Sequence, residues 1–405
     1  MKLPTIDDYN FKGKATILRV DINSPINGHG RLVVTERFYA SAETIKELSK
    51  KGAKLVVLSH QGRKGKKDFI SLRKHAKVLE KLVGKKVKFV NDIVGKKAKN
   101  AIKNLRDGEI LLLDNVRFLE DETLNKPPEE HAKSTIVKEL APLADVFVND
   151  AFSAAHRSHA SIVGFTAVLP SFAGRTMEKE VRALSKLMWR LKISKRDVFI
   201  LGGAKPEDPI KIMKHMLEEN GYIDRILTCG VLGELFLVAQ GYDLGRTTIS
   251  YLKKAGYLEY LDDVKKLWKK HSDRIEAPID VAVDKNGKRV ELTIDQLPTK
   301  YLIQDIGIKT AVKYVGEING SKNAILKGPA GVFEKEGFEI GTRIIFEGVA
   351  NSPCFSLAGG GHTLSVLQKF NVDKSKFSHV SIGGGALITY LSGKPMPGIE
   401  ALLKH

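Results

Sequence analysis

Several features that commonly identify a protein are scarce or missing in this chain of 405 residues. It has two cysteines, Cys229 and Cys354, which are too few for a disulfide framework and lack metal-ligand spacing, so we expect buried apolar thiols. The N-terminus lacks the apolar segment of a signal peptide, and no apolar run approaches the roughly 18 residues of a membrane span. These absences argue against a disulfide-rich secreted protein and a membrane protein, and predict a cytoplasmic one.

Familiar catalytic signatures are missing too. The sequence contains no Ser-His-Asp arrangement, no paired-carboxylate pattern and no His or Cys spacing typical of a metal site, so acid–base hydrolysis and metal-driven chemistry are poorly supported. A dinucleotide G-x-G-x-x-G does not follow the first strand-like run, and every "GK" lacks the Ser or Thr of a P-loop.

Basic residues are abundant. The chain has 66 Lys and Arg against 47 Asp and Glu, a formal net charge of +19 that would suit nucleic acid, anionic lipid or small anionic substrates. Lysine pairs such as Lys66-Lys67 and Lys265-Lys266 are scattered and have no aromatic residues between them, as on solvated faces. This distribution argues against nucleic acid and favours a small anion.

Glycines that follow apolar runs are the clearest positive signal. In the second half of the chain, five such runs end in glycine: "DVFILGG", "RILTCG", "AILKGPAG", "CFSLAGGG" and "HVSIGGG". Each pattern indicates a buried strand, a glycine turn and a helix, the repeating unit of a parallel sheet. Because backbone N–H groups and helix N-termini at the carboxyl ends of such strands favour anions, we predict a phosphate-bearing ligand there.

The first half of the chain repeats this layout with basic side chains in place of glycine. The runs "ATILRV", "AKLVVLS", "KVKFV", "EILLLD" and "DVFVND" predict a second parallel sheet. Taken singly, a helical arginine such as Arg37 is more often a solvated charge, and a histidine more often structural. Four clusters just past the strands instead predict an electropositive pocket for carboxylate or phosphate. Their members are Arg19, Asp21, Asn23, His60, Arg63, Asn115, Arg117, His156 and Arg157.

The length favours two domains of about 200 residues each. Pro170 and Gly174 break the chain before a helical pattern from about Thr176 to Leu191, which predicts a hinge and a linker helix. We therefore predict an α/β protein with two parallel-sheet domains joined by a hinge helix. The predicted bounds are 1–172 for the first domain, 173–192 for the linker helix and 193–389 for the second domain.

Eight motifs, taken together, resemble the phosphoglycerate kinase family, as an archaeal-type variant. They are "RVDINSP", "SHQGR", "NVRF", "NDAFSAAHRSH", "LGGAK", "GPAGVFE", "GGGHT" and "SIGGGA", in the family's order and approximate spacing over nearly the whole chain. The resemblance implies two Rossmann-like domains around a cleft, and a C-terminal tail from about 390 to 405, which includes "PMPGIEALLKH", that folds back on the first domain and belongs to it. It also implies a phosphotransferase with a carboxyl acceptor, which converts 1,3-bisphosphoglycerate and ADP to 3-phosphoglycerate and ATP in glycolysis and gluconeogenesis.

The resemblance also assigns roles by position. The implied contacts of 3-phosphoglycerate in the first domain are Asp21, Asn23, Arg37, His60, Arg63, Arg117 and Arg157. The implied nucleotide-binding residues of the second domain are Lys205, Glu334, Gly360, Gly361, His362 and Thr363. The implied catalytic residues are Arg37, Lys205, Gly361 and Gly384.

Two positions depart from the family pattern. Many members carry a second lysine where this chain has Pro209, which makes Lys211 the nearest candidate helper. Many also carry Asp, the Mg²⁺ ligand, where this chain has His362, so we predict no metal-ligating side chains and expect Mg²⁺ to be bound mainly through the nucleotide phosphates.

Two other classes of function remain open on sequence grounds. A two-domain NAD(P)-dependent dehydrogenase would share the doubly wound layout but requires the missing glycine fingerprint. A basic nucleic-acid-binding protein would bind duplex DNA with steep salt dependence. We expect small-molecule partners, no nucleic acid or membrane, and a monomer or homodimer.

Overall fold

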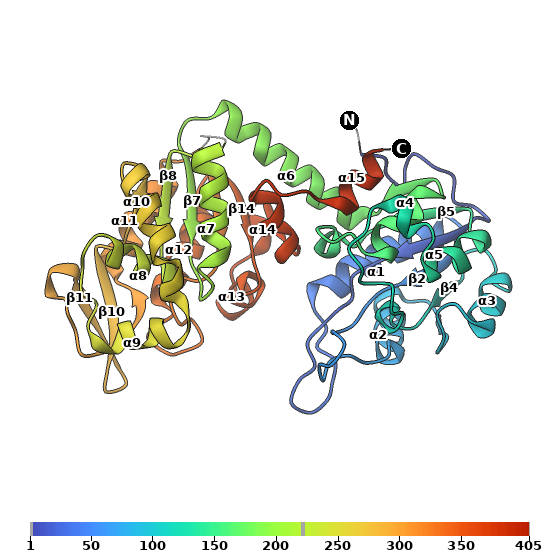
Figure 1. Ribbon diagram of the computed structural model, residues 1–405, viewed down its shortest axis with the longest axis horizontal. Coiled ribbons are helices and arrows are strands. Elements are labelled where there is room, and N and C mark those ends of the chain that lie inside the picture. The colour runs from blue at the N-terminus through green and yellow to red at the C-terminus, as the bar shows by residue number, and fades with distance from the viewer. Residues whose placement is uncertain (1–2, 220–222, 405) are drawn as a thin grey trace. The chain divides into compact units, whose positions relative to one another are not determined.

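The computed structural model describes residues 3–219 and 223–404 (Figure 1). The chain divides into two compact units: unit 1 is Met1–Arg182 with Pro395–His405, and unit 2 is Ala183–Lys394. Each unit contains a six-stranded parallel sheet with helices between successive strands, so the predicted α/β class is confirmed. No helix within the two described ranges is long and apolar enough to cross a membrane.

The sheet of unit 1 has the strand order β3-β4-β2-β1-β5-β6 and is parallel throughout. Its strands are β1 (Ala15–Arg19), β2 (Lys54–Leu58), β3 (Val87–Phe89), β4 (Ile110–Leu112), β5 (Val146–Asn149) and β6 (Ser171–Ala173). Alternate side chains enter two cores: Leu18 and Leu55 enter one, and Ile17 and Val56 the other. Because both faces are buried, these strands are continuously apolar in sequence.

Helices cover both faces of this sheet. Those of unit 1 are α1 (Glu36–Lys50), α2 (Arg73–Val83), α3 (Lys96–Lys103), α4 (Pro128–His131), α5 (Thr135–Leu140) and α15 (Pro397–Leu403). Apolar residues of α1 and α2 fill one core, and those of α3 and α5 the other. The C-terminal α15 lies on the segment Ala160–Gly164, and the backbone N–H of Gly398 donates to the Ala155 carbonyl at 2.8 Å.

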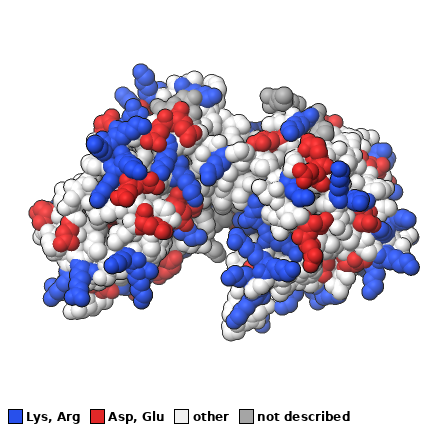
Figure 2. All heavy atoms as spheres, in the orientation of Figure 1, with Lys and Arg blue, Asp and Glu red and all other residues white. Residues whose placement is uncertain are grey.

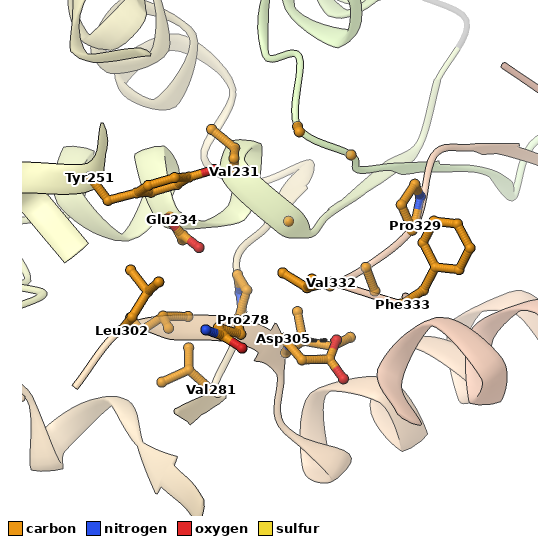
Figure 3. Close-up of a pocket in the computed structure, with 18 of the residues that line it drawn as sticks. Val231, Glu234, Tyr251, Pro278, Val281, Leu302, Asp305, Pro329, Val332 and Phe333 are labelled. Atoms are coloured by element: carbon orange, nitrogen blue, oxygen red, sulfur yellow. Dashed lines mark hydrogen bonds between the residues drawn. The ribbon is translucent and has the colours of Figure 1, made fainter. Parts of the chain in front are cut away.

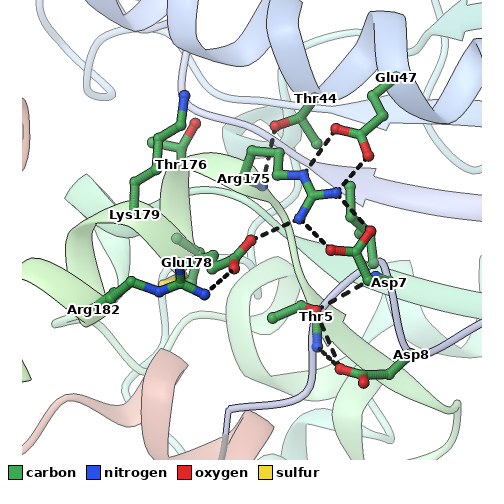
Figure 4. A network of polar contacts seen from close by, with 12 residues as sticks. Thr5, Asp7, Asp8, Thr44, Glu47, Arg175, Thr176, Glu178, Lys179 and Arg182 are labelled. Atoms are coloured by element: carbon green, nitrogen blue, oxygen red, sulfur yellow. Dashed lines mark hydrogen bonds and ion pairs between the residues drawn. The ribbon is translucent and has the colours of Figure 1, made fainter.

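The predicted linker helix is present as α6 (Arg175–Ile193). Its first residue, Arg175, donates to both carboxylate oxygens of Asp7 and of Glu47 at 2.6–2.8 Å, and to Glu178 at 2.8 Å (Figure 4). A bidentate arginine shared by three carboxylates holds the start of α6 firmly to unit 1. The boundary between the units lies further along α6, between Arg182 and Ala183.

The larger sheet of unit 2 has the order β15-β14-β13-β7-β8-β9 and is also parallel. Its strands are β7 (Asp197–Leu201), β8 (Arg225–Thr228), β9 (Ile275–Glu276), β13 (Asn323–Lys327), β14 (Phe355–Gly359) and β15 (His379–Ser381). The five glycine-terminated runs are the neighbouring strands β7, β8, β13, β14 and β15, so their turns share one edge, as predicted. The helices of unit 2 are α7 (Glu207–Lys214), α8 (Gly230–Ala239), α9 (Arg246–Lys254), α10 (Leu261–His271), α11 (Ile308–Asn319), α12 (Ile340–Asn351), α13 (Thr363–Lys369) and α14 (Gly385–Leu391).

Unit 2 also contains a smaller, three-stranded sheet, a third sheet that was not predicted. It is antiparallel, with the order β11-β10-β12, and contains β10 (Asp280–Lys285), β11 (Lys288–Thr293) and β12 (Ile303–Ile306). A two-residue turn joins β10 to β11, and both of its residues, Asn286 and Gly287, have positive φ (54° and 80°). An Asn-Gly turn is a strong local hairpin signal.

The surface charges agree with the sequence pattern. Figure 2 shows Lys and Arg side chains spread over the visible face of both units, with Asp and Glu among them. Cys229 and Cys354 are buried free thiols, as predicted.

Candidate active site

The basic edge of unit 1 is built on a buried arginine and histidine. Arg19, the last residue of β1, is 1% exposed, and its Nε donates to Ser161 Oγ at 2.8 Å. Its NH2 lies 3.1 Å from Nδ1 of His60, the second residue after β2. Since arginine can only donate, Nδ1 is the acceptor and the ring proton lies on Nε2. Burial lowers the pKa of His60 well below its ordinary value, so this ring is a neutral hydrogen-bond donor.

Asp21 connects the strand β1 to the helix α1. Its carboxylate lies 3.0 Å from Arg37 NH1 and accepts hydrogen bonds from the Ser153 hydroxyl and, at 3.0 Å, from the Asn23 backbone N–H. Burial tends to raise the pKa of Asp21, but the charge of Arg37 and the hydrogen bonds from Ser153 and the Asn23 N–H outweigh it and hold that pKa below its usual range. The carboxylate is therefore ionised and fixes Arg37 at the strand edge.

Amide side chains hold the neighbouring loops in place. Asn115 Nδ2 donates to the Gln61 carbonyl at 2.8 Å, and Asn115 Oδ1 accepts from the backbone N–H of Arg117 at 3.1 Å. Asn23 Oδ1 accepts from the Gly62 N–H at 2.9 Å, and the Arg117 guanidinium donates to the Gly62 carbonyl. These bonds join the loops that follow β1, β2 and β4.

Positive charge at this edge exceeds what nearby carboxylates neutralise. Burial, together with the charges of Arg157 and Arg19, lowers the pKa of Arg117 to about 10. Burial and the charge of Arg63 likewise lower the pKa of Arg157. Mutually repelling, partly buried guanidinium groups make a site that an anionic ligand would stabilise.

The corresponding edge of the larger sheet in unit 2, at the carboxyl ends of its strands, is formed by backbone atoms of glycine turns rather than by charged side chains. Gly203 and Gly328, after β7 and β13, have φ values of 93° and 81°. The Gly202 N–H donates to the Lys327 carbonyl and the Gly203 N–H to the Pro329 carbonyl, both at 2.8 Å. A Cβ on Gly328 would lie 2.5 Å from the Gly202 carbonyl oxygen. The two turns therefore interlock, and only glycine fits between them.

The turn after β14 carries the residues assigned to phosphate. Gly360 has a φ of 120°, and a Cβ on Gly361 would meet no atom within 4 Å. The Thr363 hydroxyl is buried and has no partner among the described residues. His362 is exposed, and its ring lies 6.1 Å from that of Phe333. Gly384, with φ 54°, lies in the turn after the adjacent strand β15, directly before α14.

A lysine that the sequence did not single out lies beside these turns. Lys205 is exposed just before α7, Pro209 is buried in it, and Lys211 is exposed in its last turn. Lys327, the last residue of β13, is 7% exposed, and its Nζ lies 3.8 Å from Asp208 Oδ2. Burial lowers the pKa of Lys327, and the carboxylates of Asp208 and Glu207 oppose that shift.

A cavity of about 310 Å³ extends from the glycine turns into unit 2 (Figure 3). Gly203, Gly230 and the segment 329–334 line it, together with His362 and residues of α8, α9 and β12. Glu334 is exposed at its rim. Most of the lining is apolar, so the cavity suits a flat apolar group attached to a phosphate chain.

Sequence reasoning missed several residues of both edges. In unit 1, Ser153 donates to Asp21, Ser161 accepts from Arg19, and the Gln61 carbonyl accepts from Asn115. In unit 2, Lys327 lies beside the glycine turns and Glu234 lines the cavity. The position of Lys327 directly before "GPAG" could have revealed it. No local pattern indicates the others.

Comparisons with known proteins agree on one family. A family model described as "Phosphoglycerate kinase" matches residues 6–394. The phosphoglycerate kinase of Methanothermobacter thermautotrophicus is 43% identical over 402 residues, covering 99% of this chain and 97% of that protein. The solved structure of the phosphoglycerate kinase from Pyrococcus horikoshii OT3 matches with a TM-score of 0.91 and 38% identity, covering 98% of each chain. That from Coxiella burnetii matches with a TM-score of 0.81 and 31% identity, covering 100% of this chain and 99% of that one.

Proposed function

This chain belongs to the phosphoglycerate kinase family, and from that premise we propose that it transfers a phosphoryl group reversibly between 1,3-bisphosphoglycerate and ADP, with the glycerate bound by unit 1 and the nucleotide by unit 2. The observation that carries the proposal is the chemical difference between the two sheet edges. One gathers guanidinium groups, and the other gathers glycine turns beside an apolar cavity. ADP and ATP are the nucleotide substrates of the family.

In unit 1, Arg63, Arg117 and Arg157 neutralise the phosphate and carboxylate of 3-phosphoglycerate, and His60 donates from Nε2. Their mutual repulsion supports this role, because a bound anion relieves it. Asp21 already accepts from Ser153, Arg37 and the Asn23 N–H, so we assign it mainly to positioning Arg37.

The chemistry requires no general base. In the direction that consumes ATP, the nucleophile is the carboxylate of 3-phosphoglycerate, which is already ionised at pH 7. Catalysis therefore depends on alignment and on neutralising the charge of the transferring group. Arg37 supplies that charge from unit 1, and Lys205 and the N–H groups of Gly361 and Gly384 supply it from unit 2.

In unit 2, the turn Gly360–Thr363 binds the nucleotide phosphates, and its unpartnered Thr363 hydroxyl supports this assignment. Glu334 binds the ribose at the cavity rim. Lys327 adds the second positive charge that Pro209 cannot give, because it is the buried cation at the same strand edge.

Mg²⁺, expected for a kinase, would be held mainly by nucleotide phosphates and water. Within the described residues, no three His, Cys, Asp or Glu side chains are grouped to hold a metal. His362 is exposed, and its ring nitrogen is a softer donor than the oxygen that Mg²⁺ prefers. Bound to the nucleotide phosphates, the ion would neutralise part of their charge.

Transfer requires the two substrates to meet. A direct in-line reaction therefore needs the units to close around both substrates and exclude water, which would hydrolyse the acyl phosphate. We assign α6, which is shared by the units, to this hinge function. A hinge at Gly174 would have to disturb the Arg175 network, so bending further along α6 is better supported.

The dehydrogenase alternative is not supported, because the family and the two solved structures are phosphoglycerate kinases. Four inferences made from the sequence stay predictions. They are the domain bounds 1–172, 173–192 and 193–389 with the C-terminal tail, the lack of a nucleic-acid partner, the cytoplasmic location and the oligomeric state.

A coupled assay with ADP and 1,3-bisphosphoglycerate tests the proposal. Wild-type chain should form ATP, Lys205→Ala should nearly abolish turnover, and His362→Ala should keep much of it over a Mg²⁺ titration. Absence of ATP formation by the folded wild-type chain would refute the function. Loss of activity in His362→Ala that extra Mg²⁺ restores would instead show that His362 binds the metal.

A further inference from the structure

A buried carboxyl group without a partner lies in the cavity of unit 2. Glu234, on α8, is 8% exposed, and its Oε2 is buried with no hydrogen-bond partner among the described residues. Figure 3 shows its carboxyl group directed into the cavity, between Tyr251 and the residues Leu302 and Pro278. An unsatisfied buried carboxyl group is costly, so its retention in a ligand cavity calls for a functional explanation.

The surroundings of Glu234 favour its neutral form. The nearby lining side chains Val231, Pro278, Val281 and Leu302 are apolar. Burial alone raises the pKa of Glu234 to about 8. At pH 7 the side chain is therefore mainly a carboxylic acid, with one O–H donor and one carbonyl acceptor.

The other ionisable groups of the cavity leave Glu234 free. Burial raises the pKa of Tyr251, on α9, and the charge of Glu234 adds to that shift, so this phenol stays neutral. Asp305, on β12, accepts from Arg289 NH1 at 2.8 Å. Figure 3 shows Phe333 across the cavity from Glu234. The ring of His362 lies 6.1 Å from that of Phe333, and Glu334 follows Phe333 in the chain.

We propose that Glu234 contacts the Watson–Crick edge of the nucleobase and that its protonation state sets the preference, since the carboxylic acid accepts adenine whereas the carboxylate favours guanine. This inference rests on the proposed function, in which the phosphates occupy the glycine turns and the base enters the cavity. Tyr251 is 41% exposed, so its ring can cover the base as it enters.

The donor and acceptor pattern decides which base fits. Adenine presents an amino donor at C6 and an acceptor at N1, which match the carbonyl and O–H of a carboxylic acid. Guanine presents an acceptor at C6 and a donor at N1, which the acid also matches when its proton lies on the other oxygen, so the neutral form accepts both bases. An ionised Glu234 has two acceptors, which suit the N1–H and amino group of guanine instead. The preference for ADP over GDP is therefore greatest below the pKa of Glu234 and falls as pH rises through it.

Calorimetric titration of ADP and GDP into the full chain between pH 6.5 and 9 tests this. The ratio of the two dissociation constants is the readout, because effects at the shared phosphates cancel in it. We expect the affinity of wild type for ADP relative to GDP to fall by roughly tenfold between pH 6.5 and pH 9. Glu234→Gln keeps one donor and one acceptor and cannot ionise, so its ratio should not vary with pH. Glu234→Leu should likewise give a ratio that does not vary with pH.

Both variants remove a buried ionisable group, so they should melt no lower than wild type. A ratio that varies with pH in Glu234→Leu as it does in wild type, or that does not vary with pH in wild type, would overturn the role of Glu234 and leave the proposed function intact. Failure of the folded wild type to bind either nucleotide would count against the nucleotide site itself.

Discussion

The basic edge of unit 1 and the glycine edge of unit 2 lie at the same place in similar sheets but are built to bind anions in different ways. In unit 1 the loops carry guanidinium groups, and hydrogen bonds from Asn115, Ser153 and Asn23 hold those loops and charges in place. In unit 2 the turns carry almost no side chains, and interlocked backbone at Gly203 and Gly328 makes the binding surface.

On the proposed assignment of one substrate to each unit, this difference follows from the ligands. A small, highly charged molecule offers little apolar area, so its binding must come from charge and directional hydrogen bonds. A nucleotide adds a large base, so the backbone can approach its phosphates while an apolar cavity accepts the base. Unit 1 should therefore be sensitive to loss of charge, and unit 2 to added volume.

The largest effect is expected for Gly328→Ala. Its Cβ would lie 2.5 Å from the Gly202 carbonyl oxygen at a φ of 81°, so both turns must shift. Unit 2 should lose roughly 3 kcal/mol or more of stability, and ADP binding should fail. Gly361→Ala, with no atom within 4 Å, is the matched control and should melt as wild type does. Normal melting and ADP binding by Gly328→Ala would show that the turns are not interlocked.

Next is Arg37→Ala, which should lower kcat on the order of 10³-fold and change 3-phosphoglycerate affinity little, because its charge acts on the transferring group. Arg106, exposed before β4 at the opposite edge of the sheet, provides the control Arg106→Ala, which should be unaffected. Steady-state kinetics measure kcat and KM separately. An unchanged kcat with a raised KM would contradict the assigned role.

A smaller loss is expected for Lys327→Met, which keeps the apolar stem of the side chain and removes the charge. ADP affinity should fall on the order of tenfold, since one partly desolvated cation near the phosphates is lost. Lys211→Met, on the exposed last turn of α7, should lose less. Equal losses in the two variants would exclude a special role for Lys327.

The effect that is smallest at neutral pH and develops only in acid concerns the stability of unit 1. His75, buried in unit 1, lies 3.0 Å from Gln61 Oε1, and burial lowers its pKa to about 4. A lowered histidine pKa gives stability that is present above the unfolded value of about 6.5 and is lost as pH falls toward 4. Wild type should therefore lose up to about 3 kcal/mol relative to His75→Gln over that range. Denaturant titrations at pH 7 and pH 4.5 check this, and parallel losses in both proteins would contradict it.

The parts of the molecule that sequence alone could predict are those with local causes. Apolar runs that end in glycine indicate strands and turns, and parallel pairing then brings Gly203, Gly328 and Gly360 to one edge without further information. The third sheet also had a local signal, the Asn286-Gly287 turn, which was overlooked. Arg19 was correctly placed at a strand end, but only the fold shows that it is buried beneath His60.

The remaining features have non-local causes. The cavity forms only when α8, α9 and β12 pack around the glycine turns, so no sequence window shows that Glu234 faces it. In the sequence, Lys327 stands at the end of an apolar run. Its nearness to Asp208 depends on the pairing of β13 with β7. Such residues are visible only in three dimensions.

Hydrogen exchange of the full chain, measured by mass spectrometry with each substrate alone, tests most directly whether unit 1 binds the glycerate and unit 2 the nucleotide. The account predicts that 3-phosphoglycerate slows exchange in the loops at 21–24, 60–63, 115–117 and 153–157. ADP should slow it at 202–205, 328–334 and 359–363. Protection of the glycine turns by 3-phosphoglycerate alone, or of the arginine-bearing loops by ADP alone, would contradict the assignment of one substrate to each unit.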